Sequence, residues 1–185
     1  MIIGVSGKSG SGKSIVSKYI ADNLNYKWID VDEYSKNIRK EYKEEIIELI
    51  NNKNILNGNG EIDSKLLGSI LFEDKTLMEK YNLFVYKKLK LIVKELIEKY
   101  KNVVIYTIFL PIMDVFSVCD YKILVICDEE TRKERLTIRD NVSLDYIKKR
   151  DSNGLNYDEE EFDLVVDNNK DYKSIIDKFI DKIKS

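Results

Sequence analysis

Short apolar runs alternate along the chain with longer segments in which apolar residues recur every three or four positions. The short runs are rich in β-branched residues and span positions 2–5, 27–30, 103–108, 122–127 and 163–166. Continuous apolar runs of this length are typical of strands that are buried on both faces of a parallel sheet. The alternation therefore predicts an α/β fold with a five-stranded, mainly parallel sheet and helices on both of its faces.

Helical spacing is found in five further segments, namely the one that follows Lys13 and then 33–50, 75–100, 129–139 and 172–183. About seventy residues separate the second strand from the third, which is far more than one crossover helix needs. We therefore expect a single domain over 1–185 with a helical insertion at about 33–100. The apolar stripe of segment 75–100 is expected to pack in the core.

The composition narrows the possible functions. The chain of 185 residues carries 31 Lys and Arg against 33 Asp and Glu, a formal net charge of −2. Such a balance gives no net field towards nucleic acid or an anionic membrane, so we expect neither as a partner. Histidine is absent, which excludes imidazole acid–base chemistry and His-ligated metal sites. A proton acceptor must then be a carboxylate, Lys, Tyr or Cys.

The N-terminus and the cysteines indicate the compartment. The first strand begins directly after Met1, without a basic region, a long apolar segment or a cleavage site. No stretch approaches the ~18 apolar residues of a membrane span. Cys119 and Cys127 lack the close spacing of a metal or redox pair, so two buried free thiols are expected. We expect a cytoplasmic protein that is a monomer or a weak homo-oligomer.

A glycine-rich loop joins the first strand to the first helix and satisfies the pattern G-x-x-x-x-G-K-[ST]. Its residues are Gly7, Lys8, Ser9, Gly10, Ser11, Gly12, Lys13 and Ser14. Glycines let successive backbone N–H groups point at phosphate oxygens, and the helix dipole adds positive potential. Lys13 is predicted to bridge the β- and γ-phosphates of ATP, and the Ser14 hydroxyl to bind Mg²⁺. Lys8 occupies a free position of the pattern, where a surface lysine and a phosphate contact are both possible.

Two aspartates, Asp30 and Asp32, follow the second predicted strand. Ligands of an open parallel sheet bind beyond the carboxyl ends of its strands. Phosphoryl transfer needs a group that orients and deprotonates the attacking hydroxyl, and in a chain without histidine an aspartate is the natural choice. We predict that Asp32 is the catalytic base and that Asp30 helps to hold Mg²⁺ or its waters. The alternative is that one of them only caps the following helix.

Arg132, Arg135 and Arg139 are three and four residues apart and share one face of a predicted helix. Arginines on a mobile lid can neutralise the charge on a transferred phosphoryl group while they exclude water. We expect a lid at about 129–155 in which at least one arginine touches ATP, with Arg139 and Arg135 ahead of Arg132. Interspersed glutamates also allow a solvated helix with ion pairs.

Beyond these motifs, nearly the whole chain resembles the dephospho-CoA kinase family. The resemblance rests on Ile3–Gly7 with the glycine loop, Ile29–Asp32, Gly60–Gly68 with Phe72 and Asp74, Glu134–Leu136 with Arg139 and Asp140, and Asp163–Asn168. It implies a P-loop kinase fold in which ATP and Mg²⁺ serve to phosphorylate the ribose 3′-hydroxyl of dephospho-CoA. By the same resemblance Asp32 is the catalytic aspartate, Arg139 a lid arginine, and Asn168 lies beside the adenine, while the helical insertion covers the acceptor.

The chain departs from this family in two places on the acceptor side. Val85 and Tyr86 stand where the family usually has His-Pro, and the run from Thr107 to Pro111 stands where it has Asp-x-Pro-Leu-Leu. Two further functions therefore remain open. One is a kinase for a nucleoside, a nucleotide or another small alcohol, and the other is a catalytically weak ATP-binding module that regulates a partner.

Overall fold

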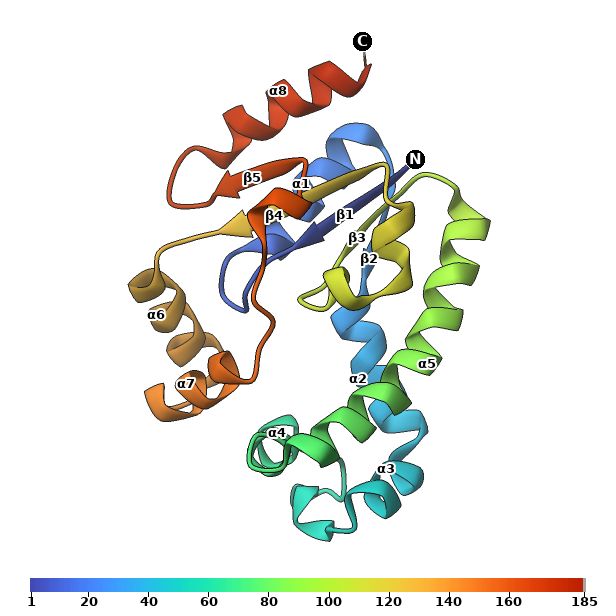
Figure 1. Cartoon of the computed structure of the whole chain (residues 1–185), viewed down its shortest axis with the longest axis vertical. Coiled ribbons are helices and arrows are strands. Elements are labelled where there is room, and N and C mark those ends of the chain that lie inside the picture. Colours follow the sequence, from blue (N-terminus) through green and yellow to red (C-terminus); the bar gives the residue numbers. More distant parts are fainter. Residues whose placement is uncertain (185) are drawn as a thin grey trace.

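The computed structural model describes residues 1–184 and contains one five-stranded sheet (Figure 1). The strand order is β2-β3-β1-β4-β5, and every neighbouring pair runs parallel. The strands are β1 (Ile2–Ser6), β2 (Lys27–Asp30), β3 (Val103–Tyr106), β4 (Tyr121–Ile126) and β5 (Leu164–Asp167). The predicted α/β fold and its parallel sheet are confirmed.

Helices cover both faces of the sheet. One face packs against α1 (Lys13–Leu24) and α8 (Tyr172–Lys184), and the other packs against α2 (Val31–Glu41) and α5 (Lys75–Tyr100). Strand β3 shows how one short run serves two cores, because successive strand residues point to opposite faces. Val104 contributes to the core under α1 and α8, while Ile105 contributes to the core under α2 and α5.

The chain between β2 and β3 is a helical extension that continues beyond the sheet, at the bottom of Figure 1. It comprises α2, α3 (Lys43–Ile50), the 3₁₀ turn η1 (Lys53–Ile55), α4 (Ser64–Leu71) and α5. Ile46 and Leu67 are buried there and belong to the same core as Ile29 and Leu89. The extension and the sheet therefore share one hydrophobic core.

The segment predicted as helical over 33–50 forms two helices, because the chain bends at Tyr42 between α2 and α3. Tyr42 has non-helical dihedral angles, φ −107° and ψ 36°. Its N–H still donates to the carbonyl of Ile38 at 2.9 Å, and its own carbonyl accepts from the N–H of Ile46 at 3.0 Å. The Tyr42 ring packs edge-on against Phe84 of α5, with ring centroids 6.1 Å apart. The bend thus lets both helices pack on α5 without loss of these backbone bonds.

Strand β3 ends at Tyr106, two residues before the predicted end, because Thr107 turns the chain. The Thr107 hydroxyl accepts a hydrogen bond from the N–H of Phe109 at 3.2 Å. Two short 3₁₀ segments, η2 (Leu110–Ile112) and η3 (Asp114–Val118), then lead to β4.

Two helices follow β4 and lie beside each other at the left of Figure 1. They are α6 (Glu129–Asp140) and α7 (Leu144–Ser152), and the 3₁₀ turn η4 (Glu159–Glu161) precedes β5. The carboxylate of Asp128 caps α6, and the Ser143 hydroxyl caps α7. The segment expected as a lid is therefore a pair of capped helices. Within residues 1–184, none of the helices has the length and apolar character to cross a membrane.

Candidate active site

The glycine-rich loop connects β1 to α1 in a conformation that requires glycine. Gly12 has a φ of +90°, and a Cβ atom built on it would lie 2.0 Å from the side-chain nitrogen of Asn168. Gly7 has a φ of +147°, and a Cβ there would lie 2.3 Å from the carbonyl oxygen of Val125. No side chain caps the N-terminus of α1. The N-terminal N–H groups of this helix can therefore bind an anion.

Three successive loop carbonyls accept hydrogen bonds from side chains outside the loop. Arg132 donates to the carbonyl of Ser9 at 3.2 Å, and Arg135 donates to that of Gly10 at 3.3 Å. Asn168, which follows β5, donates to the carbonyl of Ser11 at 2.8 Å. Because these carbonyls are held on the outer side, the loop N–H groups are left to face a phosphate.

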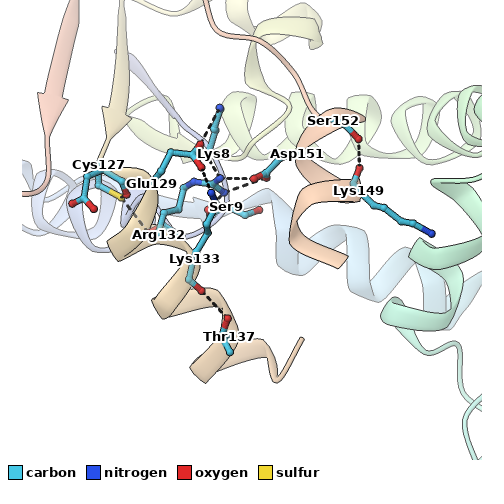
Figure 2. A network of polar contacts seen from close by, with 12 residues as sticks. Lys8, Ser9, Cys127, Glu129, Arg132, Lys133, Thr137, Lys149, Asp151 and Ser152 are labelled. Atoms are coloured by element: carbon cyan, nitrogen blue, oxygen red, sulfur yellow. Dashed lines mark hydrogen bonds and ion pairs between the residues drawn. The ribbon is translucent and has the colours of Figure 1, made fainter. Parts of the chain in front are cut away.

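Arg132 is the most deeply buried of the three arginines of α6 (Arg132, Arg135 and Arg139), with 2% of its side chain exposed. Besides Ser9 it contacts Asp151 of α7 through both carboxylate oxygens, and Glu129 at 3.3 Å (Figure 2). Arg132 therefore joins the loop to α6 and α7. Lys8 is exposed and lies 3.9 Å from Glu129, the arrangement of a surface lysine.

Lys13 is the first residue of α1 and only 8% exposed. Burial lowers the pKa of its ammonium group, the nearby Asp32 carboxylate raises it, and Arg139 and Arg150 lower it. These side chains come from α1, α2, α6 and α7. The fold thus gathers three positive groups and a carboxylate at the carboxyl edge of the sheet, where ligands of such sheets bind.

Asp32 is held by Thr107, at the point where β3 ends. The Thr107 hydroxyl donates to Oδ1 of Asp32 at 2.9 Å and accepts from the N–H of Phe109. Burial raises the pKa of the Asp32 carboxyl, and the charge of Lys13 and the bond from Thr107 act in the opposite direction. A partly buried carboxylate with a raised pKa and a fixed orientation is suited to accept a proton.

Asp30 takes the alternative role that the sequence left open. Its carboxylate accepts from the N–H of Glu33 at 3.0 Å and so caps α2. A hydrogen bond to the same carboxylate also helps to keep Tyr106 protonated. With these contacts Asp30 has less capacity for a cation than a free carboxylate, and its predicted part in metal binding stays a prediction.

Arg139 and Arg150 meet at Asp140. Arg139 donates to both oxygens of Asp140, at 2.6 and 2.9 Å, and Nη1 of Arg150 lies 3.6 Å from the same carboxylate. The pKa of Asp140 is lowered chiefly by its hydrogen bond with Arg139. One carboxylate thus sets the position of two guanidinium groups.

Several buried polar atoms of the site have no hydrogen-bond partner in the described part of the chain. They are Nε and Nη2 of Arg150 and Oγ of Ser11. Buried polar groups are almost always hydrogen-bonded, and a guanidinium presents rigid donors that match phosphate oxygens. The Arg150 donors lie near Lys13, whose pKa they lower, and fit a phosphate anion there.

Sequence reasoning missed Thr107, Arg150 and Tyr157. In the sequence Thr107 stands out only because the family has an aspartate in its place, and Arg150 has no predicted role. Tyr157 donates from its hydroxyl to the carbonyl of Ile108 at 2.7 Å, and burial raises its pKa to about 12. No local pattern marks these residues, because each acquires its partner from a distant segment.

A magnesium ion would find few protein ligands here. Within residues 1–184, no three Cys, Asp or Glu side chains gather as a metal site. This fits Mg²⁺, which is usually bound through one or two protein groups together with substrate phosphates and water. Ser14, the second residue of α1, is the protein ligand predicted from the loop.

Comparisons with known proteins point to one family. The sequence profile of the family described as dephospho-CoA kinase matches residues 1–174. A dephospho-CoA kinase of Fusobacterium nucleatum subsp. nucleatum is 37% identical over 186 residues, which cover 96% of this chain and 94% of the relative. The full extent of these matches includes both places where the chain departs from the family pattern.

Two solved structures show the same fold. One is the crystal structure of TT1252 from Thermus thermophilus. Its superposition covers 99% of this chain and 95% of the TT1252 chain, with a TM-score of 0.76 and 21% sequence identity. The other is a dephospho-CoA kinase from Campylobacter jejuni. Its superposition covers 99% of this chain and 95% of the Campylobacter chain, with a TM-score of 0.55 and 23% sequence identity. Because the family profile matches residues 1–174 and a relative is 37% identical over 96% of the chain, the chain belongs to the dephospho-CoA kinase family.

Proposed function

We propose that this protein transfers the γ-phosphoryl group of ATP to the ribose 3′-hydroxyl of dephospho-CoA and releases CoA and ADP. The observation that carries the proposal is the meeting of Lys13 with Asp32, whose carboxylate is oriented by Thr107. A phosphate-binding cation and a proton acceptor are thereby placed together at the edge of the sheet where the two substrates meet.

Asp32 acts as the base in this reaction. Thr107 occupies Oδ1, so Oδ2 is left for the acceptor hydroxyl. The proton of that hydroxyl moves to Asp32 while the oxygen of the hydroxyl bonds to the γ-phosphorus. The bond between this phosphorus and the β–γ bridging oxygen breaks, and ADP leaves with the electron pair.

Lys13, Arg139 and Arg150 stabilise the charge on the transferred group. Lys13 is the loop lysine, and the free donors of Arg150 face the same region. Removal of one preorganised donor from an oxyanion hole costs about 10²–10³-fold in kcat, and we expect a similar effect for a donor to the transferred phosphoryl group. The three cations therefore supply the main electrostatic part of the rate acceleration, while Arg135 and Asn168 keep the loop in shape around the nucleotide.

Ser14 would hold Mg²⁺ together with the nucleotide. When bound, it neutralises charge on the phosphate oxygens. Asp30 acts through ordered water at most, because its carboxylate caps α2. We place the protein in a reducing compartment, consistent with the free thiols of Cys119 and Cys127, and expect a monomer or a weak homo-oligomer.

The experiment is coupled ADP release by the purified protein with ATP and Mg²⁺. Dephospho-CoA is compared with a panel of nucleosides and nucleotides, and Lys13→Ala is the blank. We expect turnover that depends on dephospho-CoA and disappears in the blank.

If only another acceptor of the panel is phosphorylated, that acceptor and not dephospho-CoA is the substrate. Binding of ATP without turnover of any acceptor would refute the kinase proposal and leave the regulatory ATP-binding module.

A further inference from the structure

A groove lies between α5 and the two 3₁₀ segments η2 and η3, on the sheet face opposite α1. Its volume is about 450 Å³, within the roughly 300–1,000 Å³ range of small-molecule sites. Apolar side chains from both walls form most of its lining, including Leu83, Val93, Ile97, Ile112, Met113 and Val118. Leu83, Ile112 and Val118 are each at least half exposed, at 57%, 50% and 58%. The groove is therefore an accessible apolar surface that the described part of the chain leaves uncovered.

The rim of this groove is basic. Lys87, Lys90 and Lys94 project from successive turns of α5. Lys90 pairs with Asp114, and Lys94 lies 3.9 Å from Glu98. Within residues 1–184, Lys87 has no ion-pair partner, so it is an uncompensated cation beside the apolar groove.

One end of the groove is linked to the candidate base through packed side chains. Tyr86 lines the groove and packs against Phe109, with ring centroids 5.4 Å apart. The N–H of Phe109 donates to Thr107, whose hydroxyl holds Asp32. Two side-chain contacts and one short turn thus connect the end of the groove to the carboxylate.

Tyr86 also has an unmet requirement. Its hydroxyl is buried and has no hydrogen-bond partner in the described part of the chain, and it lies near the hydroxyls of Tyr81 and Tyr157. A buried hydroxyl without a partner costs free energy unless a ligand supplies the bond. Tyr86 stands at one of the two places where the sequence departs from its family.

We propose that this groove binds the pantetheine arm of dephospho-CoA. The assignment rests on the proposed function, since the 3′-hydroxyl must reach Asp32 while the arm extends from the far side of the ribose. The arm offers a dimethyl carbon for the apolar walls and amides for the Tyr86 hydroxyl. The diphosphate that joins it to the adenosine matches the charge of Lys87. The groove is the subsite that distinguishes this acceptor from a simple nucleotide.

The test compares dephospho-CoA with AMP, which carries the same 3′-hydroxyl without the arm. Val118→Glu and Ile112→Glu place a carboxylate in the groove at positions that are exposed and should tolerate it. Leu91→Glu is the control, because Leu91 is 63% exposed on α5, the helix that forms the other wall, and does not line the groove. Steady-state kinetics are measured for both acceptors. Calorimetric binding of dephospho-CoA is measured with a non-hydrolysable ATP analogue and Mg²⁺ in the nucleotide site.

We expect KM and Kd for dephospho-CoA to rise about tenfold in the two groove variants, since a charge is unfavourable in an apolar site. kcat/KM for AMP and all values of Leu91→Glu should stay within about twofold. Unchanged dephospho-CoA binding in the groove variants, or an equal loss for both acceptors, would overturn the proposal. So would a change confined to the oligomeric state in sedimentation, which would assign the groove to a second copy of the chain. Arm-dependent binding without turnover would support the groove and refute the kinase activity, so the two failures are distinguishable.

Discussion

The nucleotide side and the acceptor side of this protein are built by different means. On the nucleotide side a backbone loop binds the ligand, and Arg132, Arg135 and Asn168 hold that loop through three consecutive carbonyls. On the acceptor side, side chains line an open groove, and Tyr86 has an unpartnered hydroxyl. Backbone recognition needs glycines at fixed spacing and so leaves a readable motif. Side-chain recognition can be rebuilt with other residues, and the chain departs from its family there.

Replacement of the base should give the largest effect on the acceptor side. Asp32→Asn keeps the shape of the side chain and can still accept from Thr107, but it cannot take a proton. We expect kcat to fall about 10²–10⁴-fold with little change in ATP affinity, as measured by ADP release and calorimetry. Asp30→Asn is the matched control, because Asn caps helices as well as Asp. A comparable loss in both variants would contradict the division of roles between the two aspartates.

Replacement of Arg150 on the nucleotide side should give the next largest loss of kcat. Arg150→Met keeps much of the apolar stem and removes the donors that lack partners. We expect kcat to fall about 10²-fold, because a preorganised donor to the transferred group is lost. Lys148→Met on the same helix removes an exposed charge and should leave kcat within about twofold. Wild-type kcat in Arg150→Met would show that these donors do not face the phosphate.

Thr107 tests whether a hydroxyl orients the base in place of the missing family aspartate. Asp32 must be ionised to accept a proton, so activity rises with pH through its raised pKa. Thr107→Val removes a bond to the ionised form and raises that pKa further, which moves the acidic limb of the pH–rate profile to higher pH. We expect about a tenfold loss of kcat at neutral pH.

Thr107→Ser should restore both the rate and the profile, whereas Thr137→Val, on the exposed surface of α6, should change neither. If kcat falls equally at every pH and the acidic limb of the pH–rate profile does not move, Thr107 has only a structural role.

The sequence predicted well those features that are carried by local patterns. The strands alternate with helical segments because buried parallel strands are short apolar runs, and the loop from Gly7 to Ser14 needs only neighbouring residues to be recognised. The bend at Tyr42 was missed, because it depends on the packing of Tyr42 against Phe84 across the helical extension. Thr107 and Arg150 escaped prediction for the same reason. Their partners Asp32 and Asp140 lie 75 and ten residues away along the chain.

The buried Arg132 also bears on how the site can move. Because its guanidinium joins the loop to both Asp151 of α7 and Glu129 of α6, the phosphate-binding loop and these two helices form one mechanical unit. A swing of α6 and α7 away from the nucleotide would have to pull this buried guanidinium from the loop carbonyl of Ser9, so the loop and the two helices are expected to move together.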